Sequence, residues 1–263
     1  MKYLKYFETE AEYNAFIQSE DFILPNVSYA VDADSVFYHV VNTETGDYNM
    51  VDLGLPSGLL WADRNVGAAS PEDNGLYFQW GDTVGYTAEQ VINEEKIFDI
   101  DFSDYFDINL DDFTFNKYNS NGGLTTLDAS NDAATTYIGS DYRMPTKDEI
   151  QELIDNCTVS YIDIDNNEYS KSEWLENIYG SIMLKGINFI GPNNNRIYIP
   201  MCGMALYGEV ADSNAHSCIW SSSLSLKDSD DMKAYLIDIV HDGTNSIIES
   251  ERSIGVSVRG VKG

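Results

Sequence analysis

Histidine and serine are among the residue types in this sequence that could act in catalysis. The three histidines, His39, His216 and His241, fall in separate parts of the chain. No His-x-x-x-His pair, Gly-x-Ser-x-Gly motif or Walker pattern is present. The run Trp220–Ser223 offers three consecutive serines, but no residue near it supplies a base. We therefore expect a protein that is not an enzyme.

Residues 163–168 begin like a calcium-binding loop, with aspartate at the first and third positions and asparagine at the fifth. An EF-hand loop also needs glycine at its sixth position and glutamate at its twelfth. This sequence has Glu168 and Trp174 there. We expect a solvated acidic loop, and calcium binding has no motif to support it. No metal or cofactor site is predicted.

The cysteines are Cys157, Cys202 and Cys218, an odd number at wide spacing. This pattern is typical neither of a disulfide framework nor of a zinc site. The sequence predicts buried free thiols.

The charge of the chain restricts its partners. There are 44 Asp and Glu residues against 15 Lys and Arg, which gives a net charge of −29 at pH 7. Such a surface repels phosphate backbones and anionic lipid, so neither nucleic acid nor a membrane surface is expected as a partner. The first residues lack the apolar region of a signal peptide, and no run of 18 apolar residues occurs. Neither export by a signal peptide nor a membrane span is expected.

The sequence predicts two parts of the chain, an N-terminal unit at 1–48 and a larger domain at 49–263. Their helices and strands must position the residues discussed above. In the first unit, Thr9–Glu12 has the spacing of a capping box that begins a helix. After Pro25 an alternation with period two predicts a β-hairpin. A helix and a hairpin bury little core, so we expect this unit to serve attachment or oligomerisation. The residues expected to form its contact surface are Tyr13, Phe16, Ile17, Val27, Tyr29, Val31, Val36 and Tyr38.

The larger domain is predicted to be mixed α+β, with short antiparallel strands and one main helix. A second capping box at Thr146–Glu149 precedes an apolar stripe, which consists of Ile150, Leu153, Ile154 and Cys157. A second helix is expected at 172–179. The expected strands are 187–190, 196–200, 218–222, 233–240 and 255–258. Residues 86–140, in which acidic and aromatic residues alternate before a Gly, Thr, Ser and Asn-rich stretch, are expected to be an insertion made mostly of loop.

A series of short motifs runs through residues 50–260 in a fixed order. They are VDLGLPSGLLWA at 51–62, NVGA at 65–68, PED at 71–73, GLYFQWGD at 75–82, YRMPT at 142–146, DNCT at 155–158, GPNNN at 191–195, IP at 199–200, WSSS at 220–223 and GVSVR at 255–259. This set resembles the Fibrobacter succinogenes major paralogous domain family. The resemblance implies a C-type-lectin-like fold, related to the formylglycine-generating enzyme and to phage receptor-binding proteins diversified by retroelements. The family usually ends in Val-Arg-Pro, and Gly260 stands here in place of the proline.

The first of these motifs is expected to specify the fold rather than bind an anion. Pro56–Gly58 suits a turn, and Leu59–Trp61 suits a strand that buries the indole. A phosphate loop would need a lysine after its glycines and a helix behind it. Within the other motifs, Trp80 and Trp220 are expected in the core with Trp61, and Arg143 and Arg259 are each expected to pair with a buried carboxylate.

A second resemblance concerns the N-terminal unit. Glu12–Phe16 and Leu24–Ser28 are similar to N-terminal segments of virion proteins in crAss-like Bacteroides phages, and similar segments occur in Bacteroidetes surface proteins. Because a bacterial surface copy should carry a secretion or lipoprotein signal, the resemblance points to a phage. We expect a virion protein, a head fibre or tail appendage, made in the host cytoplasm. The alternatives are a capsid or tail decoration without receptor binding, or a bacterial surface adhesin.

The resemblance also implies partners and a binding region. Other virion proteins and host surface polysaccharide are the expected partners, and a homotrimer is expected by analogy with phage fibres. Related diversified proteins carry their ligand surface near the end of the fold that holds two exposed polar segments, 207–216 and 225–233. The candidate ligand-binding residues in these segments are Tyr207, Asp212, Asn214, His216, Lys227, Asp228, Asp230 and Asp231.

Overall fold

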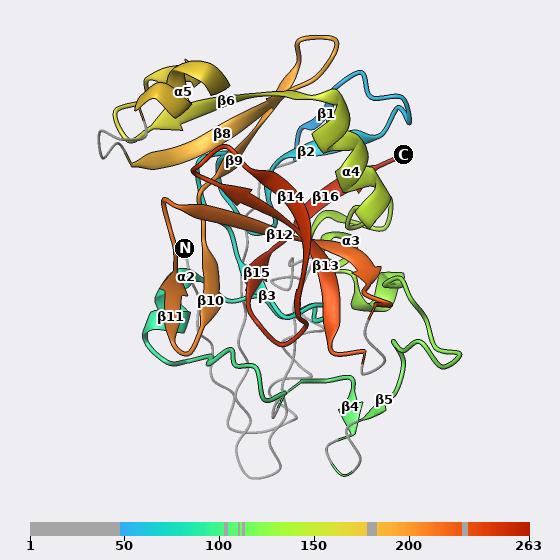
Figure 1. Cartoon of the computed structure of the whole chain (residues 1–263). Helices are drawn as coiled ribbons and strands as arrows, with labels where there is room; N and C mark the ends of the chain where they lie inside the picture. The colour runs from blue at the N-terminus through green and yellow to red at the C-terminus, as the bar shows by residue number, and fades with distance from the viewer. Residues whose placement is uncertain (1–47, 103–104, 110, 112–113, 178–182, 228–230) are drawn as a thin grey trace, which may run out of the picture. The chain divides into compact units, whose positions relative to one another are not determined.

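The computed structural model describes residues 48–102, 105–109, 111, 114–177, 183–227 and 231–263 of the 263-residue chain (Figure 1). The described residues belong to a unit that spans Gly46–Gly263. The predicted N-terminal helix, the hairpin and the eight contact residues from Tyr13 to Tyr38 lie outside the described residues, and they stay predictions.

Strands dominate the described residues, and the helices are short. The helices are α2 (Ala88–Ile92), the 3-10 helix η1 (Ala129–Asn131), α3 (Ala133–Ile138), α4 (Lys147–Asn156) and α5 (Lys171–Asn177). The strands are β1 (Met50–Asp52), β2 (Leu60–Asn65), β3 (Tyr77–Phe78), β4 (Ile108–Asn109), β5 (Thr114–Phe115), β6 (Thr158–Asp163), β7 (Glu168–Ser170), β8 (Leu184–Ile190), β9 (Arg196–Pro200), β10 (Met204–Leu206), β11 (Glu209–Ala211), β12 (His216–Leu224), β13 (Lys233–Val240), β14 (Asn245–Glu251), β15 (Val256–Ser257) and β16 (Arg259–Lys262).

The strands of the described residues form three larger sheets and two hairpins. The sheet orders are β1-β2-β16, β7-β6-β8-β9 and β14-β13-β12-β15-β3, and the hairpins are β4-β5 and β10-β11. Neighbouring strands are antiparallel except β12 and β15, which run parallel with Ile219 opposite Ser257. The structure is thus mixed α+β, with several antiparallel sheets and few short helices, as predicted. The strands predicted at 196–200 and 233–240 coincide with β9 and β13. The strands that were not predicted are β1, β3, β4, β5, β6, β7, β10, β11, β14 and β16.

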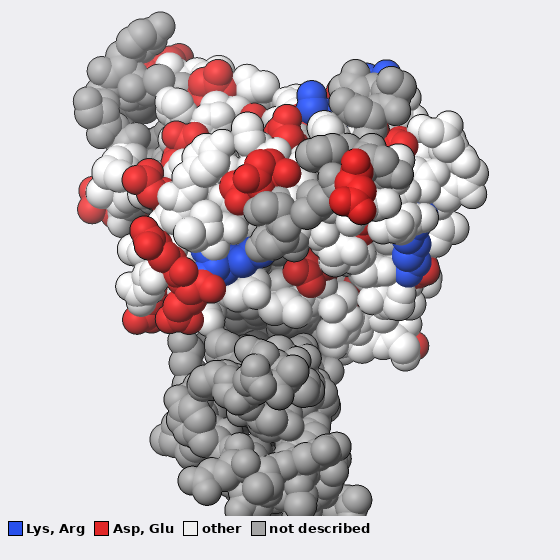
Figure 2. Space-filling model, turned by 90° about the horizontal axis from the view of Figure 1, so that it is seen from below, with Lys and Arg blue, Asp and Glu red and all other residues white. Residues whose placement is uncertain are grey.

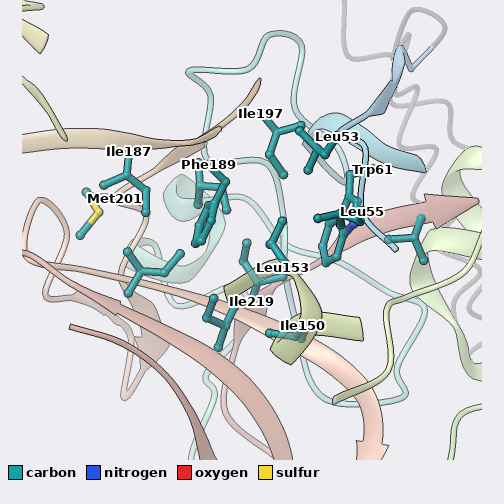
Figure 3. Packing of buried hydrophobic residues seen from close by; sticks show 14 of the residues in the cluster. Leu53, Leu55, Trp61, Ile150, Leu153, Ile187, Phe189, Ile197, Met201 and Ile219 are labelled. Atoms are coloured by element: carbon teal, nitrogen blue, oxygen red, sulfur yellow. The ribbon is translucent and has the colours of Figure 1, made fainter. Parts of the chain in front are cut away.

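Helix α4 packs its apolar side into the main core. The predicted capping box is present, because Thr146 accepts a hydrogen bond from the Glu149 amide and the Glu149 carboxylate accepts one from the Thr146 amide. Ile150 and Leu153 are each 1% exposed, as the stripe predicted. Figure 3 shows these two side chains beside Ile219 of β12, in the same cluster as side chains of the β8–β9 hairpin. The core therefore lies between α4, the four-stranded sheet and the five-stranded sheet.

The segment at 51–58 is held in place by the turn of the β8–β9 hairpin. The side-chain amides of Asn193 and Asn195 both donate to the carbonyl oxygen of Asp52, each at 2.8 Å. Residues 56–58 form a turn in which the Gly58 amide donates to the Leu55 carbonyl. Strand β2 then buries Trp61, which is 2% exposed. The predicted structural role of this motif is confirmed.

Trp80 and Trp220 are fully buried and hydrogen-bonded. The Trp80 indole donates to the Ser221 carbonyl at 2.8 Å, and the Trp220 indole donates to the Phe78 carbonyl at 2.9 Å. A buried indole N–H needs an acceptor of this kind. These bonds join the end of β3 to β12, and the prediction that the tryptophans are core residues is confirmed.

Residues 86–140 attach to the domain through buried aromatic side chains. The described part of this segment is irregular between α2, β4, β5, η1 and α3. Phe102, Tyr105 and Phe115 form a cluster of edge-to-face rings with centroids 5.4 to 6.1 Å apart. The guanidinium of Arg252 lies over this cluster, 3.7 Å from the Phe115 centroid and 5.2 Å from the Tyr105 centroid. The alternation of acidic and aromatic residues thus places rings against the domain around a buried cation.

Arg252 has few hydrogen bonds for an arginine that is 0% exposed. One amino group donates to the Tyr118 carbonyl at 2.9 Å, and the other lies 3.6 Å from the Asp107 carboxylate. Its Nε and Nη2 atoms have no hydrogen-bond acceptor. Asp107, which is 3% exposed, accepts bonds from the backbone amides of Lys117 and Tyr118. The aromatic rings and Asp107 therefore supply much of the stabilisation of this buried charge.

Asp128 should stabilise the fold at neutral pH and lose that contribution in acid. Hydrogen bonds from Ser130 and Lys117 lower the pKa of its carboxyl from 3.8 to about 2. The folded state therefore favours the ionised form, and the contribution is present above the unfolded pKa and disappears as pH falls through the folded pKa. Because the side chain is 43% exposed, Asp128→Asn should lower the free energy of unfolding by only about 0.5–1 kcal/mol.

Urea unfolding of wild type and Asp128→Asn, at neutral pH and again near pH 2, measures this effect. The two proteins should differ at neutral pH and converge in acid. A difference that is constant over this range would show that the Asp128 charge is not responsible.

Candidate binding surface

The β10–β11 hairpin presents an exposed aromatic side chain at its tip. Leu206 pairs with Glu209, so Tyr207 and Gly208 form a two-residue turn. Both have positive φ, 52° and 76°, which is the signature of a type I′ turn that prefers Asn and Gly. A tyrosine in this conformation has backbone strain. Its side chain is 60% exposed, so core packing does not offset the strain.

Two further exposed apolar side chains lie on segments that contact the hairpin. The Tyr207 amide donates to the Phe98 carbonyl at 2.7 Å, and helix α2 contacts β11. Ile92 and Ile97, which lie on these contacting segments, are 61% and 46% exposed. Figure 1 shows α2, β10 and β11 together at the lower left of the molecule. We call Tyr207, Ile92 and Ile97 the hairpin surface.

Asp212 and Asn214 lie on the loop that leads from β11 into β12, and His216 is the first residue of β12. The backbone fixes this loop, because the His216 amide donates to the Asp212 carbonyl at 2.9 Å and the Asn214 amide donates to the Met201 carbonyl at 3.1 Å. The Nδ1 atom of His216 lies 3.0 Å from the Asp238 carboxylate on β13. These three predicted residues are therefore separated from Tyr207 by the short strand β11.

The second predicted segment lies at the other end of β12. A strand of nine residues separates its ends by about 25–30 Å. Lys227 forms an ion pair with Glu249 at 3.1 Å. Asp231 is 6% exposed, and its carboxylate accepts hydrogen bonds from the amide and hydroxyl of Ser120. The two predicted segments thus form no single surface, and Asp231 is a buried link where an exposed residue was expected.

Two of the predicted residues, Asp228 and Asp230, lie outside the described residues. Their part in a binding surface stays a prediction.

The serines of β12 take part in hydrogen bonds of the fold. Ser221 donates to the Tyr235 carbonyl at 2.8 Å, and Ser222 donates to the Pro145 carbonyl at 3.3 Å. The Ser223 hydroxyl accepts a bond from the Lys147 amide. Backbone groups in these contacts cannot act as a base for a nucleophile. The serine run therefore joins β12 to β13 and to the start of α4.

The cysteine thiols lie in surroundings that lower their reactivity. All three are free, and Cys202 and Cys218 are 0% exposed, as predicted. Cys157 is half-buried, so for this residue the prediction of burial holds only in part. Burial and the nearby Glu152 raise the pKa of the Cys157 thiol to about 11. Burial and Asp238 likewise raise the pKa of Cys218. Because the thiolate is the reactive form, these thiols are poor nucleophiles at neutral pH.

The acidic loop at 163–168 is closed by its own hydrogen bonds. Residues 164–168 are exposed, as predicted, whereas Asp163 is 3% exposed, so the prediction of a solvated loop fails only for its first residue. Its carboxylate accepts bonds of 2.8 to 3.0 Å from the Asp165 amide, from both nitrogens of Asn167 and from the Tyr169 hydroxyl. Burial opposes ionisation, but these hydrogen bonds outweigh it and lower the pKa of Asp163. Among the described residues, no group of three or more His, Cys, Asp or Glu side chains could hold a metal ion.

Arg143 and Arg259 differ in their partners. Arg143 donates two hydrogen bonds to the Glu149 carboxylate, at 2.6 and 2.7 Å, as predicted, although this pair is partly exposed. Arg259 is 0% exposed and donates to the Asn65 side-chain oxygen and to the Tyr198 carbonyl. The prediction of a carboxylate for Arg259 is wrong, because neutral oxygens bind it without burying a second charge. Burial lowers the pKa of Arg259 to about 10.

Acidic side chains are spread over the surface. On the face that Figure 2 shows, Asp and Glu are distributed widely, with few Lys and Arg between them. This distribution follows from the net charge of −29. In the part of the chain that the structure describes, no helix combines the length and the apolar character that a membrane span requires.

No protein-family model matches this chain, and neither curated proteins nor solved structures give a significant match. Support for the hairpin surface therefore comes from its own geometry and exposure.

Proposed function

We propose that this chain is a non-enzymatic phage virion protein, a head fibre or tail appendage, whose lectin-like domain binds host surface polysaccharide. The observation that carries the proposal is the conformation of Tyr207. Its φ of 52° disfavours tyrosine, and its ring is 60% exposed. Since the ring adds little to stability, a partner outside the chain explains its presence. Tyrosine combines an apolar ring with a polar hydroxyl, which suits contact with a sugar.

The positions of the motif residues support a lectin-like domain. Trp61, Trp80 and Trp220 are buried, and the 191–195 turn binds the 51–58 segment through Asn193 and Asn195. Motifs distant in the sequence therefore meet in the core, which is expected of residues that specify one fold. The virion assignment rests on the resemblance of the N-terminal segments to phage proteins.

Two measurements on phage and host test the proposal. Mass spectrometry of purified virions should detect this chain, and its absence there would overturn the virion assignment. The recombinant full chain should compete with phage adsorption and bind polysaccharide isolated from the host surface. A chain that is present in virions but neither competes nor binds would be a decoration protein, and the receptor-binding part of the proposal would fail.

Tyr207→Asn should separate binding from stability. Binding to host polysaccharide should weaken by about tenfold or more, as for a central aromatic contact residue. The free energy of unfolding should stay unchanged or rise by up to about 1 kcal/mol, because asparagine tolerates positive φ. Leu226→Asn is the matched control, since Leu226 is 55% exposed and lies beyond the other end of β12. Equal binding by Tyr207→Asn and wild type would remove the hairpin surface from the proposal.

A further inference from the structure

A groove of about 510 Å³ lies where α4 ends and where β6, α5 and β14 begin. Its apolar side consists of Ile154, Cys157 and Val159, which are half-buried against the main core. Its polar side includes Ser170, Lys171 and Asn245. This volume lies within the range of small-molecule binding sites. The groove is formed by elements other than those of the hairpin surface (Figure 1).

The ammonium group of Lys171, a residue that lines this groove, has no hydrogen-bond or ion-pair partner among the described residues. In the part of the chain that the structure describes, every other Lys or Arg has an oxygen acceptor, a charged partner or an aromatic ring, whereas none is found for Lys171. The Lys171 side chain is exposed, so its ammonium needs no partner within the chain and is free to bind one from outside. It can bind an anionic group of a ligand.

Asn245 adds an unsatisfied amide to the same groove. Its Oδ1 atom is buried and accepts no hydrogen bond. A buried polar atom of this kind normally has a partner. Rotation of the amide would exchange its oxygen and nitrogen ends with little change in shape. Asn245 is half-buried and lines the groove, so the accessible end of its amide can bind a hydroxyl group there.

The charge around the groove limits how tightly an anion would bind. The carboxylate of Glu173 accepts hydrogen bonds from the Ser170 amide and hydroxyl, at 2.8 and 2.6 Å. These bonds lower the pKa of Glu173, so it is a fixed negative charge close to Lys171. An isolated anion would gain little binding free energy there. A ligand that also contacts Asn245 and the apolar side of the groove would gain more.

We propose that this groove binds a sugar that carries a carboxylate, such as a uronic acid. The carboxylate pairs with Lys171, a ring hydroxyl binds Asn245, and the apolar face of the ring lies against Ile154 and Val159. This proposal rests only on the residues of the groove, and it does not depend on the hairpin surface or on the virion assignment. For a monosaccharide, a dissociation constant of about 1 mM is expected from its size.

The test is a titration of the ¹⁵N-labelled full chain with sodium glucuronate, followed by amide chemical shifts. Glucose and sodium acetate, each at the same concentration, are the reference ligands. Glucuronate should cause saturable shifts at residues 154–159, 170–172 and 245, and neither reference ligand should reproduce them. Equal saturable shifts with acetate or with glucose would overturn the sugar-acid assignment, and no shifts at these residues would overturn the site.

Substitutions at the groove complete the test. Lys171→Met should weaken glucuronate binding about tenfold or more, and Lys171→Arg should keep part of it. Lys185→Met is the control, because the Lys185 ammonium binds Asn166 on the β6–β7 turn and is not part of the groove. Equal affinity of Lys171→Met and wild type would overturn the proposal. Tyr207→Asn should leave glucuronate binding at the groove unchanged, which separates this site from the hairpin surface.

Discussion

Arg252→Ala is expected to lower the free energy of unfolding by about 3–5 kcal/mol, the range for breaking a buried charge pair. The substitution removes the cation that lies over Phe115, Tyr105 and Trp80, and it leaves Asp107 as a buried carboxylate without its arginine. It also leaves a cavity at a side chain that is 0% exposed. The aromatic cluster of residues 86–140 should loosen first, because Arg252 is the charged group on which it packs.

Denaturant unfolding of Arg252→Ala and of two comparison variants measures this effect. Arg196→Ala removes an exposed arginine whose ion pair with Glu168 is 3.0 Å long, and it should lower the free energy of unfolding by less than about 1 kcal/mol. Arg252→Met fills the cavity without a charge, and it should recover part of the loss. If Arg252→Ala were no less stable than Arg196→Ala, the buried cation would not hold the cluster.

Gly191→Ala should destabilise the domain by about 3 kcal/mol or more, at the upper end for overpacking. A Cβ atom on Gly191 would overlap the carbonyl oxygen of Leu53 and lie 2.9 Å from the Leu53 side chain. The obstacle is backbone, so it cannot be relieved by a rotamer change. The 191–195 turn would have to move away from the 51–58 segment and lose its bonds to the Asp52 carbonyl.

Gly260→Ala is the matched control for this prediction. Gly260 is also buried, but an added Cβ would meet the end of the Ile138 side chain, which can change rotamer. A loss of about 1 kcal/mol is expected there. Thermal unfolding of both variants distinguishes them, and equal stability would mean that the 51–58 segment can shift without loss.

Local patterns predicted much of the fold. The Thr146 and Glu149 pair predicted the start of α4 because a capping box acts within one turn of helix. The apolar run within 233–240 is typical of a buried strand, and β13 has this range. Strand β14 was missed, since the adjacent Ile247 and Ile248 break the alternation. Strand β6 was missed for the same reason, since Tyr161 and Ile162 are adjacent and break the alternation.

The candidate sites depend on contacts between residues that are far apart in the sequence, and local sequence patterns do not predict such contacts. Asp231 binds Ser120, which is 111 residues away in the chain, so its burial could not be read from its neighbours. The aromatic cluster around Arg252 likewise joins two distant segments. The Tyr-Gly pair at 207–208 is a local signal, because two short strands that flank a glycine-containing pair predict a hairpin turn. Its strain became apparent only when the structure gave φ for Tyr207.

Strand β2 lies between β1 and β16, with Trp61 opposite Val261. During translation β2 leaves the ribosome long before β16 is made, so one edge of β2 has no partner while most of the domain is being synthesised. Pairing between residues this far apart in sequence is slow. A free edge can accept the same strand from another copy of the chain. Until its own β16 has been made and has paired, β2 can therefore bind β16 of another copy, and this edge of the sheet is closed only by the last strand of the domain.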